Sequence, residues 1–246
     1  MNQLLIQLLH PMKNRSFYKL TILTLLVYVL VPLKLSAQQL DVNADLVSSF
    51  VWRGFFQGND GPAFQPTLSL STDQFNIGVW GSTDFKSAKE IDLFIGYTVG
   101  PLSLTVTDYW WEGQYAAGYF NYTKNKTDHW MEASLGYDFE EALPLTLTWS
   151  TMLYGPDTNA GGEKMYSSYL EAIYSTSMKG VGLDMGIGVV PFRSDFYQCN
   201  RFAVTNIFLK GSKKLKISDT FELPLFVQLI FNPSAEQSHL VAGFSF

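Results

Sequence analysis

Residues 91–107, IDLFIGYTVGPLSLTVT, contain two stretches in which apolar residues alternate with polar or small ones. Apolar side chains occupy every second position from Ile91 to Tyr97, and again from Leu102 to Val106. Gly100-Pro101, which lies between the two stretches, would break a helix but suits a tight turn. Because successive side chains of a strand point to opposite faces, the pattern predicts two antiparallel strands and no membrane helix.

The same alternation recurs to the end of the chain and predicts 12 strands in one all-β domain covering residues 38–246. Its clearest instances are residues 42–53, 67–71, 75–79, 131–138, 145–150, 181–189 and 240–246. Alternation alone also fits a soluble β-sandwich, whose apolar face is a core and whose polar face meets water. Three further features favour a closed antiparallel transmembrane barrel.

First, if residues 38–246 form 12 strands, each strand with its connection has the length expected of a tilted membrane strand and a turn. Second, connections of two lengths alternate, with longer ones at 58–63, 86–89, 112–128, 155–164, 191–200 and 232–238 and mostly short ones between them. Third, aromatic residues gather near the predicted strand ends, as in interfacial girdles. Two rims of unequal loop length predict an outer-membrane barrel with both chain ends on the short-turn side.

The last strand alternates up to Phe244 and Phe246, the C-terminal residue. This ending resembles the C-terminal signal by which the insertion machinery reads outer-membrane barrels, although an ordinary edge strand can also end in phenylalanine. Pairing the last strand with the first would remove an exposed sheet edge. We therefore expect Phe244 and Phe246 to act as an assembly signal.

Residues 1–37 predict a cleaved signal peptide. Basic Lys13, Arg15 and Lys19 precede the short apolar run 20–32, and Leu35-Ser36-Ala37 resembles a small-residue cleavage site. The run is shorter than the roughly 20 residues of a spanning helix, although an uncleaved anchor remains the alternative. Export across the inner membrane places the barrel in the outer membrane of a diderm bacterium, in contact with its lipid.

Composition excludes several other classes of protein. Charged residues make up 16% of the chain, and the net charge is −5. Because the segment 1–37 holds four basic residues and no acid, the remainder is still more acidic and lacks the basic face that nucleic acid requires. The single cysteine, Cys199, excludes a disulfide scaffold. No spacing of His, Cys or acids indicates a metal or cofactor.

The inner face is the candidate site. Arg53, Asp92, Glu132 and Glu171 occupy non-apolar positions toward the long-loop half of their strands, and charges at mid-depth disfavour the lipid face. We expect Arg53 to pair with at least one of the three acids, either as part of a filled barrel or as a lumen constriction that favours cations. The irregular alternation at 201–209 and the lipid-side position of Asp108 predict a bulge at either place.

A family resemblance rests on the segments SFVWRG (49–54), QGNDGPAFQP (57–66), NIGVWGS (76–82) and EIDLFIGY (90–97). These segments resemble the TorF-type porin family of uncharacterised bacterial outer-membrane barrels. The resemblance implies an outer-membrane barrel and maps recurrent family features onto Arg53-Gly54 and residues 90–92. The long aromatic loop 113–122 departs from the family pattern.

Two functions of different class follow. The small residues of the inner face favour a narrow porin-like channel for small ions or polar solutes, with weak cation preference and no enzymatic activity. The alternative is a closed structural or adhesin-like barrel that uses Tyr115, Tyr119, Phe120 and Tyr122 as a contact patch. An outer-membrane hydrolase built on Ser238-His239 is a distant third possibility. The sequence leaves the solute and the oligomeric state open.

Overall fold

The computed structural model describes residues 38–246 except 59–60, 87–88, 114, 116–117, 125 and 140–142. The predicted signal peptide, residues 1–37, lies outside the described residues. Within the described part, every regular element is a strand, and none of it forms a helix long and apolar enough to cross a membrane.

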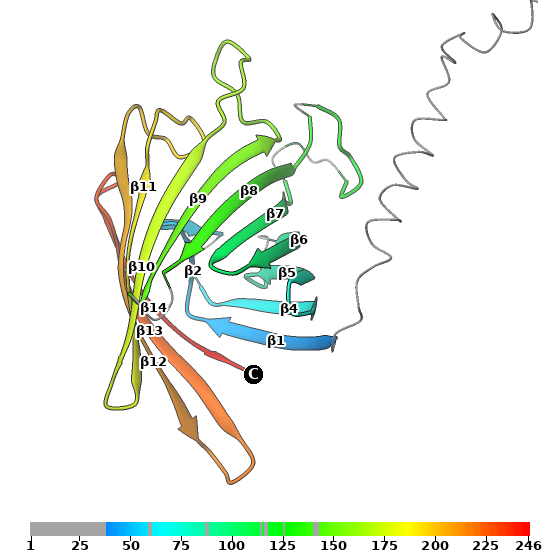
Figure 1. Cartoon of the computed structure of the whole chain (residues 1–246). Coiled ribbons are helices and arrows are strands. Elements are labelled where there is room, and N and C mark those ends of the chain that lie inside the picture. Colours follow the sequence, from blue (N-terminus) through cyan, green and yellow to red (C-terminus); the bar gives the residue numbers. More distant parts are fainter. Residues whose placement is uncertain are drawn as a thin grey trace, which may run out of the picture. The chain divides into compact units, whose positions relative to one another are not determined.

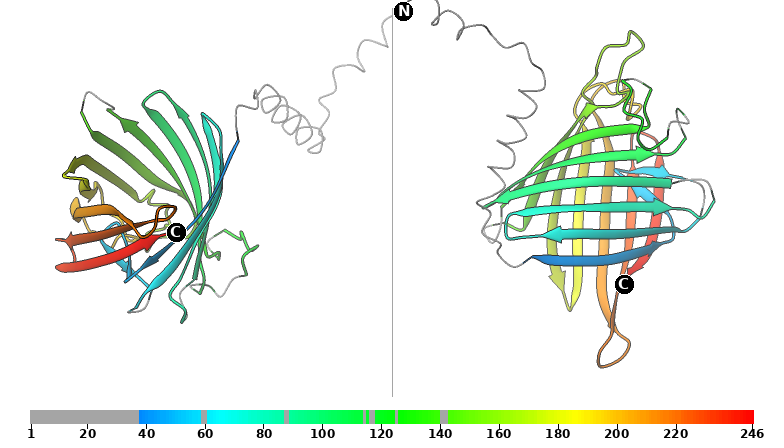
Figure 2. Two further views of the ribbon diagram at one scale, coloured as in Figure 1. Left: turned by 90° about the horizontal axis from the view of Figure 1, so that it is seen from below. Right: turned by 90° about the vertical axis from the view of Figure 1, so that its right-hand side faces the viewer.

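Twelve of the described strands form one closed antiparallel barrel, as the sequence predicts (Figures 1 and 2). Each strand pairs with its neighbour in the chain, and the last strand pairs with the first. The barrel strands are β1 (Gln39–Val47), β4 (Ala63–Ser71), β5 (Phe75–Thr83), β6 (Lys89–Val99), β7 (Leu102–Trp111), β8 (His129–Asp138), β9 (Leu145–Tyr154), β10 (Ser168–Met178), β11 (Val181–Val190), β12 (Ala203–Lys216), β13 (Glu222–Asn232) and β14 (Gln237–Ser245).

The two faces of the barrel wall differ in the way that the alternation predicts. In β6, Leu93 and Ile95 are exposed on the outer face, whereas Asp92, which precedes Leu93, is buried on the inner face. Exposed apolar side chains recur on the outer face of the other strands, including Leu68, Leu70, Ile77, Leu104, Val106, Leu135, Ile187, Leu209 and Leu229. The outer wall is therefore an apolar surface that a lipid environment would cover.

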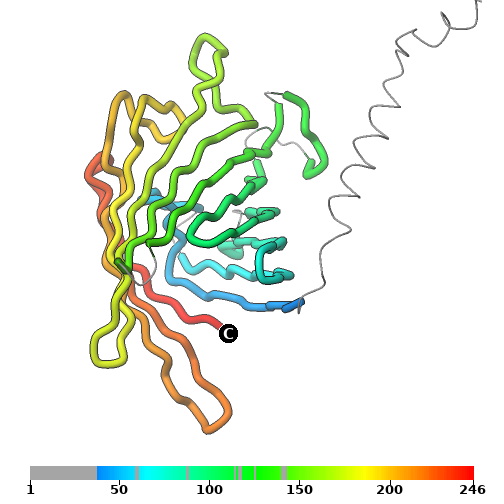
Figure 3. Tube along the Cα trace, viewed as in Figure 1, coloured from blue at the N-terminus to red at the C-terminus, as the bar shows by residue number. Residues whose placement is uncertain are grey.

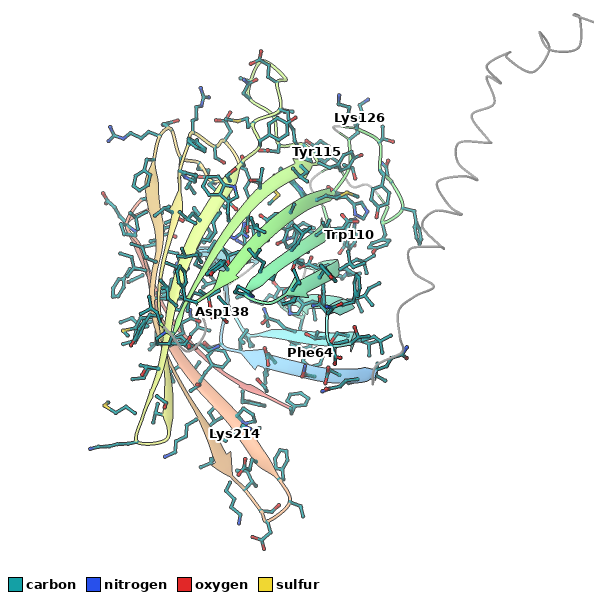
Figure 4. The ribbon with its side chains drawn as sticks, viewed as in Figure 1. Phe64, Trp110, Tyr115, Lys126, Asp138 and Lys214 are labelled. Carbon is teal, nitrogen blue, oxygen red and sulfur yellow. The ribbon has the colours of Figure 1, made fainter. Side chains whose placement is uncertain are left out.

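The two rims also differ as predicted. Gln39 pairs with Ser71 beside the short connection 72–74, so β1 begins at the short-turn rim, and β14 runs toward the same rim. At that rim the hairpin of β12 and β13 extends beyond the other strands, with Lys214 near its tip (Figures 3 and 4). The long connections gather at the opposite rim.

The seam that closes the barrel is short. Three residue pairs, from Asp45 with Ser245 to Val47 with Gly243, join β1 to β14, whereas nine pairs join β1 to β4. Next to the pair of Asp45 with Ser245, the backbones of Ala44 and Phe246 exchange two hydrogen bonds. Backbone pairing between the last and first strands thus removes part of the exposed sheet edge.

One detail of the strands differs from the sequence prediction, and another is confirmed. The first strand ends at Val47 and does not continue to Arg53, because the chain turns into a separate hairpin made of β2 (Phe50–Trp52) and β3 (Phe55–Gln57). The expected bulge is present in β12, where Thr205 is the extra residue between Val204 and Asn206. At Asp108 the pairing of β7 is regular.

Candidate functional site

The β2–β3 hairpin lies inside the barrel at the long-loop end and spans its lumen. On one side Arg53 at its tip contacts Glu132 of β8, and on the other the adjacent Gly54 contacts Thr205 of β12. The Asn232 side chain also donates a hydrogen bond to the Gly54 carbonyl at 3.1 Å. A Cβ atom on Gly54 would lie 1.8 Å from the Thr205 carbonyl oxygen, so only glycine fits this approach.

The turn at the tip of the hairpin is tight and conformationally unusual. Trp52 pairs with Phe55, so the turn consists of Arg53 and Gly54 alone. Their φ angles are +53° and +85°, the left-handed values that a type I′ hairpin turn requires at both central residues. Asparagine or aspartate usually precedes the glycine in such turns, and arginine there carries a backbone cost that its contacts must offset.

Arg53 forms a bidentate ion pair with Glu132. Its Nη1 lies 2.6 Å from Oε2 and its Nη2 lies 2.8 Å from Oε1. Only 12% of the arginine side chain and 1% of the glutamate side chain are exposed. The Tyr109 hydroxyl donates to Glu132 at 3.0 Å, and Arg53 donates to the Tyr197 hydroxyl at 2.5 Å. Such geometry is what a buried ion pair needs to offset the loss of hydration.

Aromatic rings enclose the guanidinium group. Its central carbon lies 4.4 Å from the ring centre of Trp52 and 4.5 Å from that of Tyr169. Tyr197 comes from the connection 191–202, which also folds inward. Together with Cys199 of the same connection, it packs on Tyr169 and Val190. The inner end of the long-loop half is thus filled by the hairpin and this connection.

The four predicted inner-face residues all lie in the lumen, but they do not form a single cluster. The ion pair of Arg53 in the described structure is with Glu132. Glu171 accepts hydrogen bonds from Tyr169 at 2.8 Å and from Asn206 at 3.2 Å, and the Tyr169 ring in turn contacts Arg53. Asp92 lies on the inner face of β6 and has one buried carboxylate oxygen without a hydrogen-bond partner in the structure.

Two adjoining cavities open between the hairpin and the wall at the long-loop mouth. The first, of about 280 Å³, is lined mainly by aromatic side chains, namely Trp52, Phe55, Phe56, Trp111, Phe196 and Tyr197. The second, of about 210 Å³, is lined by Asp84, Glu90, Glu112 and Lys89 together with Phe50 and Trp111. Trp111 and Gln57 line both cavities. The alternation pattern does not reveal these cavities, because they depend on where the hairpin folds.

The long aromatic loop after β7 folds against the outer wall and not over the mouth. Tyr122 stacks on His129 at 4.0 Å between ring centres, and its hydroxyl donates to Asp108 at 2.8 Å. Burial and this hydrogen bond raise the pKa of the Tyr122 phenol. The Asp108 carboxylate therefore has a hydrogen-bond donor from the loop on the outer face. The Phe120 side chain of the same loop is 90% exposed. Figure 4 labels Tyr115 and Lys126 in this loop and Trp110 beneath it.

The remaining residues of interest lie elsewhere. Phe246 is on the outer face, with its ring 6.0 Å from that of Phe244 and 6.3 Å from that of Phe64. Ser238 and His239 are consecutive in β14, so their side chains point to opposite faces of the wall. The His239 ring stacks on Phe56 inside the barrel. This pair cannot bring a serine nucleophile and its base together.

These features define a closed twelve-stranded antiparallel barrel with an inward hairpin held by a buried ion pair. The model of a bacterial family of unknown function, Gcw_chp, matches residues 34–196, more than half of the chain. The chain belongs to this family. Its description carries no activity, and the match does not extend to the narrower TorF-type label.

Other comparisons add little. No curated protein matches the sequence. A solved structure described as the CymD monoaromatic hydrocarbon channel is similar at 10% sequence identity, with a TM-score of 0.39 over 85% of this chain and 87% of that chain. A likeness of this size says nothing about function.

Proposed function

We propose that this chain is an outer-membrane barrel that forms a narrow pathway for small ions or polar solutes, with a weak preference for cations. The apolar outer wall supports a place in a membrane, since a soluble barrel would turn such a surface inward. The predicted signal peptide and the resemblance to TorF-type porins point the same way. The insertion machinery and outer-membrane lipid are its expected partners.

The charge of the inner face carries the proposal of cation preference. Arg53 is neutralised by Glu132, and Lys210 lies opposite Asp184 in the register of β11 and β12. Asp45, Glu90, Asp92 and Glu171 also lie on the inner face. Carboxylates that line a narrow pore raise the local concentration of cations and disfavour anions.

The inward hairpin favours a second candidate, a closed barrel that binds a ligand or partner and transports nothing. The hairpin and the connection 191–202 occupy the long-loop half of the lumen, as a plug would. Purified protein in a planar bilayer tests the two proposals. We expect single-channel conductance steps and a reversal potential that shows a preference for cations. If a membrane with a high protein content showed no conductance steps, the channel proposal would be wrong and the closed barrel would be favoured.

A further inference from the structure

The two cavities at the long-loop mouth combine an aromatic wall with an acidic one. In the aromatic cavity, Trp52 and Trp111 lie 6.1 Å apart and each lies about as far from Phe196, at 6.1 and 5.9 Å between ring centres. The remaining polar groups of this cavity are the Gln57 and Gln198 amides and the Tyr197 hydroxyl. An uncharged cavity with aromatic faces suits one ring or a short alkyl group.

The adjoining cavity has an excess of carboxylates. Glu90 is 9% exposed and Asp84 is 8% exposed, and both line it beside Glu112. Lys89 lies 2.9 Å from Glu112, so the single lysine of this cavity is already matched by an acid. A cation placed here would lie beside the Glu90 and Asp84 side chains, while the lysine that lines this cavity is engaged by Glu112.

The same aromatic cluster already holds one cation within the protein. The guanidinium of Arg53 lies against the inner face of Trp52, where ring faces attract positive charge. The outward side of the cluster, at Trp111, faces the acidic cavity. The aromatic rings and the carboxylates at this mouth therefore both attract a positively charged group.

We propose that the paired cavities bind a small organic cation, with its ring or alkyl body in the aromatic cavity and its ammonium group beside Glu90. The combined size of the cavities, about 280 and 210 Å³, suits a molecule of one ring with a short amine arm. This inference rests on the proposed function in one respect: the site would lie at the mouth of the proposed cation-preferring channel.

The test uses three probes of similar shape and different charge, namely benzylamine, benzyl alcohol and benzoate at pH 7. Binding to the full-length mature barrel in detergent micelles is measured by titration calorimetry, with protein-free micelles as the blank. We expect benzylamine to bind at least about tenfold more tightly than benzyl alcohol, since a charged hydrogen bond supplies that difference. Benzoate should give no measurable heat of binding.

Two variants assign the site, and a third is the control. Glu90→Gln should weaken benzylamine binding about tenfold and leave benzyl alcohol unchanged, whereas Trp111→Leu should weaken both. Glu236→Gln, at an exposed position on the same rim, should change neither. Equal binding of the amine and the alcohol, or full affinity in the Glu90→Gln variant, would overturn the site. Binding without conductance would refute only the channel, and conductance without binding would refute only this site.

Discussion

Replacing Arg53 with alanine should release the hairpin from the lumen wall. The arginine holds Glu132 through two short hydrogen bonds, and both side chains are almost fully buried. Removing one partner of such a pair costs about 3 to 5 kcal/mol, because the other charge stays buried. Even a loss of about 3 kcal/mol changes the ratio of docked to released hairpin by more than about 100-fold.

The assay is single-channel recording of the Arg53→Ala variant in planar bilayers. We expect larger or longer openings and a reversal potential shifted toward cations, because Glu132 loses its partner. Arg193→Ala is the matched control: Arg193 pairs with Asp195 in an exposed ion pair, which contributes at most about 1 kcal/mol. In a closed barrel the Arg53 variant would instead unfold at lower temperature and pass no current.

A double variant sharpens the result. If Arg53 and Glu132 act together, Arg53→Ala combined with Glu132→Ala should be less damaging than the two single losses summed, as coupled residues are. Unchanged conductance and stability in Arg53→Ala, or a shift of selectivity toward anions, would show that the ion pair neither holds the hairpin nor offsets the acids.

Further predictions concern the hairpin and the seam. Gly54→Ala should undock the hairpin, because a Cβ atom would overlap the Thr205 carbonyl, and intrinsic tryptophan fluorescence should shift to longer wavelength; Gly118→Ala in the outer loop should not shift it. Asp45 and Ser245 face each other across the seam, and because the neighbouring pair, Ala44 and Phe246, exchanges two hydrogen bonds, they form a non-hydrogen-bonded pair. The combined substitutions Asp45→Cys and Ser245→Cys in a Cys199→Ser background should therefore form a disulfide and raise the unfolding temperature. Deleting Phe246 should reduce the heat-modifiable folded fraction on gels far more than Phe120→Ala does; equal folding would mean that the terminal residue carries no signal. Phe64 would be a poor control, since its ring contacts that of Phe246.

The barrel itself follows from local sequence. Alternation fixes which face each side chain of β6 or β11 takes, and the unequal connections fix the two rims. Even the bulge at Thr205 is foreshadowed by the irregular alternation of 201–209. These features depend on near neighbours in the chain, which is why the sequence predicts them.

The contents of the lumen could not be predicted in the same way. The prediction extended the first strand through Arg53 because Phe50, Trp52 and Ser49 continue the alternation. The sequence signal for a turn is the two-residue Arg53-Gly54 loop between aromatic residues, but arginine is an unusual choice there. What fixes the hairpin is its fit to Glu132 and Thr205, residues far away in the sequence.

The separation in sequence between the hairpin and its docking surfaces has a consequence for biogenesis. The hairpin belongs to the first quarter of the barrel chain, whereas Tyr197, Thr205 and Asn232 belong to its last third. A nascent barrel that has not yet closed therefore leaves Trp52 and Phe55 in water and Arg53 without its contact to Tyr197. Docking of the hairpin would then be a late event that reports completed assembly, and the protein carries its own optical marker for that event in Trp52.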